Sequence, residues 1–445
     1  ITMATISSLG IGSGLDLSSI VSGLVDAERV PTENRLSFEE EIATTKLSAF
    51  GALKSSISLF QGTLSTLQSS STYNTKSSSL SDTSVFSASV TSIADVGSYA
   101  VEVTDLAQNH SLATSALTAF ADVNDTIGSG TLTIKFGTTT TEPYSFDQDT
   151  TKATQVITVN AANGNTTLSG MRDYINENDL GINASIINDG SGYRLTLTSK
   201  DSGAKNSMEI TVTDDSDGFN NDNAGLSQLA FNTNAQTSML QTVVAQDATL
   251  TINGLDITRE TNTVTGAING VTLNLLKKDI GNVVNVNISN DEGKVLSSVQ
   301  EFVEGYNGLT QTINALTSYD ASNEVSGVLI GDSTVRSIKS QLRSLMTNAV
   351  AQLSGNVRSL VDIGITTNSD DTLKINSTKL SAAISNFPDQ IEALFREQGR
   401  PTNDGITYSA STSDTQPGNY SVFVNTLSTQ GVYNGTTLNS LNIGT

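Results

Sequence analysis

Few residues in this chain of 445 have the types and spacing that chemistry requires. The chain contains no cysteine and a single histidine, His110, so thiolate nucleophiles, cysteine metal sites and Ser–His–Asp triads lack their raw material. Because no second histidine could share a site with it, we expect His110 to lie in a surface loop. The glycine-rich run at 10–14 follows no strand and lacks the G-x-G-x-x-G spacing of a nucleotide-binding loop. The sequence therefore predicts no catalytic, cofactor-binding or metal-ligating residue, and a protein that is not an enzyme.

The densest group of carboxylates lies between Asp214 and Asp222. Carboxylate and amide oxygens are the ligands that Ca²⁺ prefers. An EF-hand loop counted from Asp215 needs glycine at its sixth position, where this chain has Asn220. We therefore expect a solvated loop at the edge of a domain.

Composition narrows the classes of partner. Acidic residues outnumber basic ones by 45 to 23, and the resulting net charge of −22 argues against nucleic acid or an anionic membrane as a partner. Hydrophobic residues make up 36% and aromatic residues 5%, which favours thin layers or long helices over one thick core. No segment approaches the roughly 18 apolar residues of a membrane span, and residues 1–25 lack the features of a secretory signal peptide. If the protein is exported, we expect it to leave the cell by another route.

Long helices are the strongest structural signal, and the first begins near the N-terminus. Asp16 has the position of an N-cap, and Pro31 is expected to interrupt the helix before a new start near Glu33. From there, two rows of residues recur every seven positions, as in a coiled-coil seam. The rows are Leu36, Ala43, Phe50, Ile57 and Leu64, and, three positions later, Glu39, Lys46, Leu53, Phe60 and Leu67. The seam is apolar throughout its second half and polar at Glu39 and Lys46.

A second seam occurs much later in the chain. Its apolar residues are spaced alternately by four and three positions: Val295, Val299, Phe302, Tyr306, Leu309, Ile313 and Leu316. An isolated helix cannot bury such a stripe, so the simplest topology packs the two seams against each other in one bundle. The alternative is two independent helical units.

Strand patterns fill the interval between the seams. Residues that alternate as in β-strands are found at 85–90, 99–103, 131–136, 156–159, 250–257, 271–275 and 284–288. Asn253-Gly254 is a dipeptide that type I′ hairpin turns favour, a short helix is predicted over 168–177, and a hairpin is predicted to join 186–187 to 193–197. After the second seam we expect a helix capped by Asp332 or Ser333, and a last helix that Pro388 kinks or restarts.

These patterns predict an α+β multidomain protein, in which antiparallel β-rich domains are inserted into a long α-helical coiled coil or bundle. The expected divisions are a flexible segment at 1–32, a helical bundle at 33–75 plus 292–398, a β-rich domain at 76–118 plus 238–291, and an inserted β-rich domain at 119–237. The pattern G-[SN]-Y-[AS]-V at 97–101 recurs at 418–422, so a further β domain is expected to start within 402–445. Because the chain stops within this pattern, we expect it to be truncated.

Glu39 and Lys46 are the candidate contact residues, because they interrupt an otherwise apolar seam. Most seam residues are expected to form an intramolecular core. The alternative for the first half of the seam is a surface that faces solvent or another subunit.

Five blocks of sequence, in their order and spacing, resemble the flagellar filament cap protein family, also called hook-associated protein 2. The blocks are 12–16 with 20–24 and 28–31; 97–108; 246–254 continuing to 273; 302–307; and 331–338 followed by 360–365 and 373–375. Residues 168–176 also resemble the Ile-Asn motif of flagellar axial proteins.

The resemblance implies a structural protein that forms a homo-oligomeric plate with legs at the distal tip of the bacterial flagellum, where it helps exported flagellin subunits fold and insert. The terminal segments would form the leg, which contacts the filament, and the β domains the plate. The implied partners are further copies of the chain, flagellin, hook–filament junction proteins and an export chaperone that grips a C-terminal helix. That helix pairs with the N-terminal one in the family, and we expect it beyond residue 445. The implied export route is the flagellar type III pathway.

Two alternatives remain beside the cap. One is another flagellar axial protein, either a hook–filament junction protein or a flagellin-like subunit; such chains carry long helical stretches at both ends, whereas the seam at 295–316 is internal. The other is a flagellum-borne adhesin that binds host glycans through its β domains.

Overall fold

A computed structural model describes residues 16–141, 144–215, 218–233, 238–320, 324–350, 353, 355–396 and 399, with short stretches between 405 and 425. The chain divides into two compact units, residues 1–395 and residues 396–445. Within the first unit there are three separate hydrophobic cores, one among helices and two among strands. The α+β multidomain class predicted from the sequence is confirmed.

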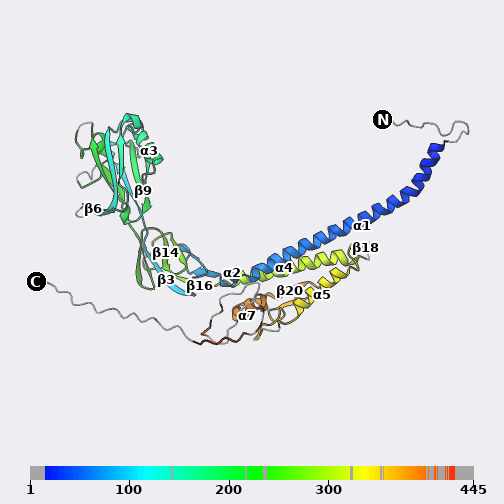
Figure 1. The fold of residues 1–445 in the computed structure, drawn as a ribbon. Helices are drawn as coiled ribbons and strands as arrows, with labels where there is room; N and C mark the ends of the chain where they lie inside the picture. Colours follow the sequence, from blue (N-terminus) through cyan, green and yellow to red (C-terminus); the bar gives the residue numbers. More distant parts are fainter. Residues whose placement is uncertain are drawn as a thin grey trace. The chain divides into compact units, whose positions relative to one another are not determined.

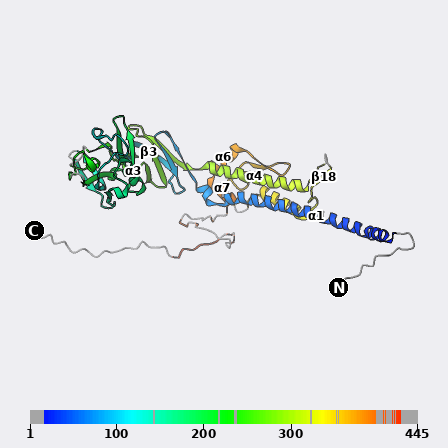
Figure 2. The same ribbon diagram turned by 90° about the horizontal axis from the view of Figure 1, so that it is seen from above.

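The helical core is built on two long antiparallel helices, α1 (Leu17–Gln68) and α4 (Glu292–Thr317), which lie side by side in Figures 1 and 2. The smaller elements of this region are α2 (Ser70–Asn74), β17 (Tyr319–Asp320), β18 (Val325–Ser326), α5 (Ser333–Thr347), β19 (Ile365–Thr367), β20 (Leu373–Ile375), α6 (Ser377–Asn386) and α7 (Pro388–Phe395). The two seams read from the sequence contact each other in this core, as a single bundle requires.

Helix α1 is continuous through Pro31, so the expected interruption there is wrong. Proline removes the N–H that would donate to the carbonyl of Ala27, which normally breaks a helix. Every described side chain from residue 18 to residue 48 is exposed, so water can bind the freed carbonyl. The carboxylate of Asp16 accepts the backbone N–H of Ser19 at 3.1 Å, and the N-cap predicted at Asp16 is confirmed. Asp332 and Pro388 also begin helices, as predicted.

The first β core lies between two antiparallel sheets, with strand orders β1-β16-β3-β12-β13 and β14-β15-β2. The strands are β1 (Lys76–Leu80), β2 (Phe86–Val90), β3 (Gly97–Asp105), β12 (Ala248–Ile252), β13 (Leu255–Arg259), β14 (Thr263–Ile268), β15 (Val271–Leu275) and β16 (Val284–Asn290). Strands β12 and β13 turn at Asn253-Gly254, whose φ angles of 51° and 80° are both positive, as a type I′ turn requires. That predicted hairpin is confirmed.

The second β core also lies between two sheets, with strand order β11-β4-β9-β8 in one, and β10-β5-β6 with β7 beside β5 in the other. Its elements are β4 (Asn109–Thr114), η1 (Ala116–Thr118), β5 (Gly130–Thr141), β6 (Tyr144–Gln148), β7 (Gln155–Val159), η2 (Ala161–Asn163), α3 (Leu168–Glu177), β8 (Ile182–Asn188), β9 (Tyr193–Ser202), η3 (Ala204–Asn206), β10 (Ser207–Asp214), η4 (Gly225–Leu229) and β11 (Met239–Val243). The helix at 168–177 and the β8–β9 hairpin are as predicted.

The side chain of Asn176 ties α3 to the neighbouring sheet. Its oxygen accepts the N–H of Ala184 at 2.8 Å, and its amide donates to the carbonyl of Ala184 at 2.9 Å. The preceding residue, Ile175, is fully buried in the core, and so is Met171, one turn before Ile175. The Ile-Asn pair therefore gives the helix one apolar anchor and one polar anchor at its C-terminal end.

The two β regions are nested insertions, and each is entered and left through paired segments. The N–H of Asp291 donates to the carbonyl of Thr75 at 2.9 Å, next to the first pair of the β1–β16 ladder, Lys76 with Asn290. In the same way, Gln108 and Gln246 donate to each other's carbonyls at 2.9 and 3.3 Å. We expected the inserted domain to span 119–237, but β4 and β11 belong to its core, so its limits lie near residues 108 and 246.

The further β domain expected over 402–445 falls largely outside the described residues. Residues 420–424, which are described, are exposed and have no strand assignment. Among the described residues, no helix combines the length and apolar character that crossing a membrane would need.

Candidate functional site

The candidate site is the part of α1 that extends beyond the helical core. Between residues 18 and 48 every described side chain is exposed, and the first buried residue of the helix is Ala49. This segment nevertheless carries many large apolar side chains, each more than 40% exposed: Ile20, Val21, Leu24, Val25, Val30, Leu36, Phe38, Ile42 and Leu47. An exposed helix with this much apolar surface is typical of a surface that binds another protein.

The predicted seam residues occupy different environments in α1 and in α4. Six of the seven seam residues of α4 are at most 7% exposed: Val295, Val299, Phe302, Tyr306, Leu309 and Ile313. In α1, Leu53 and Phe60 are buried, and Ile57 and Leu64 are half-buried. Phe50 is 37% exposed at the edge of the core, and Leu36 is 55% exposed outside it. The heptad pattern begins at Leu36, whereas the first buried residue is Ala49, so the intramolecular seam starts nearly four turns later than the pattern suggests.

The contact face of α1 is also wider than the one we expected. Leu53, Phe60 and Leu67 lie at its centre, and Ala49, Ser56 and Thr63 form a row on one side that we did not predict. In the predicted row on the other side, Ile57 and Leu64 pack against the core. The hydroxyl of Ser56 lies 3.3 Å from that of Thr312 in α4, and Thr63 packs against Gly305. Sequence reasoning missed this row because small and hydroxyl side chains resemble a surface. The sequence did contain a signal for this row, because Ala49, Ser56 and Thr63 recur every seven positions and α4 carries a glycine, Gly305, where the helices can approach closely.

Aromatic side chains fill the widest part of the helical core. The Phe60 ring lies 5.6 Å from that of Phe302 and 5.9 Å from that of Tyr306, and Phe302 lies 5.6 Å from Phe395. Burial raises the pKa of the Tyr306 phenol above its ordinary value. Asp371 forms ion pairs with Lys339 and Arg343 of α5 at 3.1 and 3.0 Å, and this contact joins α5 to the β19–β20 hairpin. Through the ring of Phe60, the C-terminal half of α1 is packed into this core.

Two glycines of α4 test how closely the helices approach. A Cβ at Gly305 would lie 3.0 and 3.1 Å from the side-chain atoms of Thr63, whereas a Cβ at Gly308 would meet nothing within 4 Å. We expect Gly308→Ala to stabilise the bundle by up to about 1 kcal/mol, through helix propensity alone. Gly305→Ala should destabilise it by about 1 kcal/mol or more, because the helices must separate. Urea unfolding followed by helical circular dichroism compares the two, and equal stabilisation by both would contradict the close approach.

Glu39 and Lys46 both lie on the exposed segment of α1. Glu39 is ten residues before Ala49, the first buried residue of the helix, and Lys46 is three residues before it. Glu39 is 3.9 Å from Arg35 in an exposed pair of the same helix. Among the described residues, the side chains around Glu39 and Lys46 are exposed, which fits the alternative of a surface that faces solvent or another subunit better than an intramolecular core. They remain candidates for a contact with another molecule.

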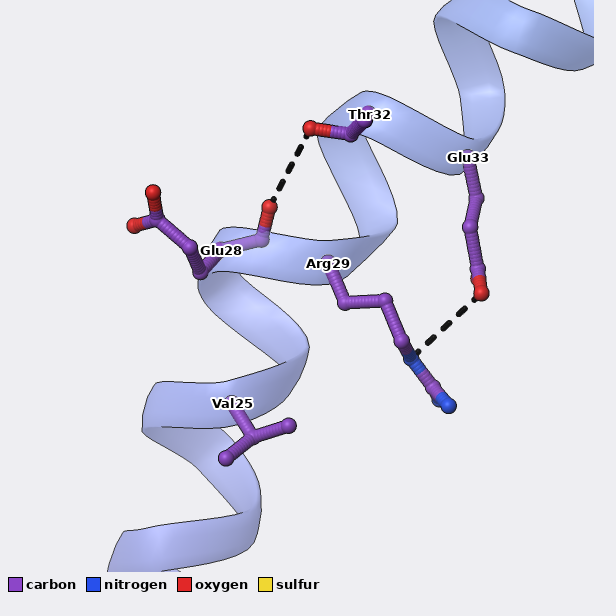
Figure 3. Close-up of a pocket in the computed structure, with 5 residues that line it drawn as sticks. All are labelled: Val25, Glu28, Arg29, Thr32 and Glu33. Carbon is purple, nitrogen blue, oxygen red and sulfur yellow. Dashed lines mark hydrogen bonds and ion pairs between the residues drawn. The ribbon is translucent and has the colours of Figure 1, made fainter.

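The surface hollow in Figure 3 belongs to α1 alone. Its lining residues are Val25, Glu28, Arg29, Thr32 and Glu33. Arg29 lies 3.6 Å from Glu33 and 3.1 Å from Asp26, so its guanidinium bridges two carboxylates along the helix. Since no second element contributes a wall, the hollow is part of an open surface rather than an enclosed ligand site.

His110 does not lie in a surface loop, and that expectation is wrong. It is fully buried in β4, with its ring 5.7 Å from that of Phe231. Its Nδ1 accepts the backbone N–H of Met208 at 2.8 Å, so the neutral ring carries its proton on Nε2, which lies 2.8 Å from the amide nitrogen of Gln241. Because both of these nitrogens donate, the hydrogen bond between them requires the flipped carboxamide, with the oxygen of Gln241 facing the ring. Burial lowers the pKa of His110 to about 4, because the ring has no counter-charge to stabilise a cation. The ring is therefore a neutral strut between β4, β10 and β11.

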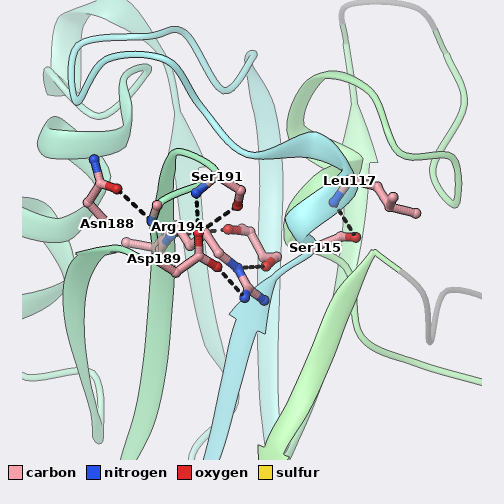
Figure 4. Close-up of polar contacts among 9 residues, drawn as sticks. Ser115, Leu117, Asn188, Asp189, Ser191 and Arg194 are labelled. Atoms are coloured by element: carbon pink, nitrogen blue, oxygen red, sulfur yellow. Dashed lines mark hydrogen bonds and ion pairs between the residues drawn. The ribbon is translucent and has the colours of Figure 1, made fainter.

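A polar network fixes the tip of the β8–β9 hairpin, shown in Figure 4. Asp189 accepts from the hydroxyl of Ser191 and from Arg194, which also donates through Nε to the carbonyl of Thr114 at 2.6 Å. Hydrogen bonds from Ser191, then from Arg194, lower the pKa of Asp189 to about 2. Each group has a partner within the β8–β9 hairpin or in β4, so the network stabilises the hairpin tip against β4 and has a structural role.

The acidic segment at 214–223 is partly structural. Asp214 is buried, against our expectation of a solvated loop, because its carboxylate accepts the N–H groups of Leu226 and Ser227 at 2.6 and 3.2 Å and caps η4. The described residues that follow, including Asp222, are exposed as expected. Within the described parts of the chain, no group of three or more His, Cys, Asp or Glu side chains is arranged to hold a metal ion. The glycine-rich run at 10–14 lies outside the described residues.

Family models match most of the chain. The model for the N-terminus of flagellar hook-associated protein 2 matches residues 13–110, and the model for its C-terminus matches residues 245–429. Between them, the flagellin hook IN motif matches residues 131–201, which include α3 and Asn176.

Individual relatives agree with these models. The flagellar hook-associated protein 2 of Escherichia coli strain K12 is 35% identical over 91% of this chain and 83% of its own length. The B-type flagellar hook-associated protein 2 of Pseudomonas aeruginosa is 34% identical over 85% of this chain and 78% of its own. Among solved structures, the D1-D2-D3 domains of the flagellar cap protein FliD from Escherichia coli match with a TM-score of 0.58 and 34% identity, covering 78% of this chain and 89% of that one.

Proposed function

The chain belongs to the flagellar hook-associated protein 2 family, the flagellar cap proteins, and we propose that it forms a homo-oligomeric plate at the distal end of the filament that promotes the folding and insertion of exported flagellin subunits. Membership makes it a structural component of the flagellum, in a family not known for enzymes. In this proposal the protein is extracellular and is exported by the flagellar type III route.

One observation supports this proposal above the others, namely the exposed apolar segment of α1. The same helix that is buried at Leu53 and Phe60 continues for about eight turns with exposed apolar residues. A cap must remain attached while new subunits enter beneath it, so it needs a contact of many weak parts rather than one compact anchor. A long helix with scattered apolar residues and mixed charge fits such a detachable contact.

The proposed partners are further copies of the chain, flagellin and the hook–filament junction proteins. An export chaperone would bind the C-terminal segment that the family pairs with α1. The flagellin hook IN motif at 131–201 is equally compatible with another axial protein, and this remains the second candidate. Binding of host glycans by the β domains is the third, and binding of the full chain to a glycan array tests it.

Immunogold electron microscopy of intact flagella tests the location. Antibody raised against the protein is expected to label the distal tip alone. Label along the whole shaft would favour a filament subunit or a shaft-borne adhesin, and label only near the hook would favour a junction protein. Flagella without any label would contradict the proposed function altogether.

Glu39 and Lys46 are proposed to contact the filament, or a neighbouring subunit, through the exposed segment. Replacing both with alanine is expected to lower the fraction of capped filaments severalfold and to increase the flagellin lost to the medium. Arg29→Ala with Glu33→Ala is the matched control, because it also removes one acid and one base, from a different side of the same helix. Unchanged cap retention in the first variant, or equal loss in both, would contradict the role of Glu39 and Lys46.

A further inference from the structure

The outer β region, which holds the first β core, and the inner β region, which holds the second, meet at more than their paired crossing. The turn at 202–206 joins β9 to β10 in the inner region and contacts two acidic residues of the outer region. These are Asp247, which directly precedes β12, and Glu260, which directly follows β13. Since β12 and β13 form one antiparallel hairpin, both residues lie at the end of it that is opposite its turn.

Three polar contacts join the turn at 202–206 to the outer region. Oδ1 of Asp247 accepts the backbone N–H of Ala204 at 2.7 Å, and the hydroxyl of Ser202 donates to the backbone carbonyl of Glu260 at 2.8 Å. Lys205 forms an ion pair with the carboxylate of Glu260 at 2.9 Å. Because two of the three contacts use main-chain groups, they fix the position of the turn itself and not only that of its side chains.

Gly203 shows how closely the turn approaches the outer region. A Cβ at this position would lie 2.8 Å from the Cβ of Glu260 and 2.9 Å from its carbonyl oxygen. Its φ of 105° is also one that favours glycine. Gly190, at the tip of the β8–β9 hairpin, has a similar φ of 93°, but a Cβ there would meet nothing within 4 Å. The two glycines are therefore alike in φ and differ in whether the outer region lies against them.

Each side of the contact is held in shape by its own region. In the turn, the buried side chain of Asn206 donates to the carbonyl of Ser202 at 2.7 Å. In the outer region, the carboxamide of Asn262 binds both the N–H and the carbonyl of Ala107, at 2.8 and 2.9 Å, close to Glu260 in the chain. Parts that are already ordered lose little conformational entropy when they meet, so a small contact between them can be stable.

We propose that the turn at 202–206 is a latch that holds the inner β region closed on Asp247 and Glu260, and that the paired crossing is the hinge that remains when the latch opens. The turn is one short unit, so displacing it breaks its three contacts together. Opening leaves both β cores intact, because Ser202, Lys205, Asp247 and Glu260 belong to neither. The latch goes beyond the proposed function, since it concerns two regions of a single chain and needs neither a filament nor a second copy.

The absence of native cysteine allows the joint to be measured with two spin labels in the full chain. Ser87→Cys in β2 and Thr213→Cys in β10 place one label at an exposed position of each region. Double electron–electron resonance should give a single narrow distribution of distances between these labels. A distribution as wide as that between labels on a freely hinged joint would overturn the latch, and the variants that follow supply that reference.

Gly203→Ala adds a methyl group where the outer region leaves no room, and it should at least double the width of the distance distribution. Gly190→Ala imposes similar backbone strain away from the joint and should leave the width unchanged. A second label pair within the inner region, Asn183→Cys with Thr213→Cys, should stay narrow in both variants, which shows that the region remains folded. Equal widths across the joint in the two glycine variants would overturn the latch.

A charge exchange tests the same contact without changing the backbone. Lys205→Glu places a carboxylate against that of Glu260 and should also at least double the width, whereas adding Glu260→Lys should restore the narrow distribution. Lys200→Glu is the matched control, because it reverses a charge whose partner, Asp179, lies within the inner region, and it should have no effect. A double variant as wide as Lys205→Glu alone, or no difference between Lys205→Glu and Lys200→Glu, would overturn the latch. The purified chain suffices, so either result is independent of where antibody labels the flagellum.

Discussion

Replacing Phe302 with alanine is expected to destabilise the helical bundle by about 4 kcal/mol, which is most of the stability of an ordinary domain. Phe302 is 2% exposed, and its ring lies 5.6 Å from those of both Phe60 and Phe395. Truncation removes the contact between α1, α4 and α7 at one point and leaves a cavity that helices of this length cannot collapse around. Urea unfolding followed by helical circular dichroism measures the loss.

The same helix pair supplies a matched control. Phe38 lies in α1 and is 63% exposed, so Phe38→Ala should change the free energy of unfolding by no more than about 0.5 kcal/mol. Phe302→Leu keeps most of the volume and should lose less than half as much as Phe302→Ala. If Phe38→Ala were as costly as Phe302→Ala, the exposed segment of α1 would be packed within the monomer, contrary to the structure.

Acid is expected to weaken the second β core through His110, by up to about 3 kcal/mol. The ordinary pKa of histidine is 6.5, and burial lowers that of His110 to about 4. Below pH 6.5 the unfolded chain therefore binds a proton that the folded chain refuses until about pH 4. The stabilising contribution is complete above pH 6.5, and it is lost progressively as the pH falls from 6.5 to 4.

The hydrogen bonds of the His110 ring also predict a loss of stability in acid. A proton on Nδ1 would face the N–H of Met208, which now donates to that atom, and the strut between β4 and β10 would be lost. Desolvation is the cause of the shift, so no neighbouring charge reverses it.

The measurement uses the fact that the chain has one histidine, because its ring proton resonances report a single titration. The free energy of unfolding of the β region at pH 7 and pH 5 is then compared with that of His110→Asn, whose amide oxygen can still accept from Met208 but does not titrate. We expect the fall between the two pH values to be larger in the native chain. An equal fall in both would mean that carboxylates, rather than His110, cause the acid sensitivity.

Local signals predicted the elements well. The N-cap at Asp16, the turn at Asn253-Gly254 and the limits of α3 each depend on a few neighbouring residues whose conformational preferences agree. The buried positions of α4 could also be predicted from the sequence, because apolar residues on a buried helix face recur every three or four positions.

Environment was harder to predict, because it depends on residues distant in the sequence. His110 reads as a loop residue until β10 and β11 bring Met208 and Gln241 to its two ring nitrogens. The heptad pattern in α1 extends back to Leu36, but α4 ends at Thr317, and nothing in α1 itself records where its partner stops.

The environment of the candidate site could be predicted only in part. Glu39 and Lys46 were singled out because they interrupt a seam, and the structure gives both an exposed position on α1. The extension of the contact face to Ala49, Ser56 and Thr63 was not predictable from α1 alone, because small side chains become contact residues only opposite a close approach such as that at Gly305.

The paired crossings between the nested regions determine how the chain bears tension. A pull on the inserted β regions is divided between two covalent backbones, at Thr75 and Asp291 for the outer insertion and at Gln108 and Gln246 for the inner one. Because both strands of each crossing run between the same two bodies, tension draws them in one direction and does not slide one past the other. The hydrogen bonds that pair them are therefore not in series with the load. Each crossing therefore acts as two parallel tethers, whereas between the two crossings a load on the inner β region passes through the antiparallel β3–β16 ladder, which is pulled from opposite ends.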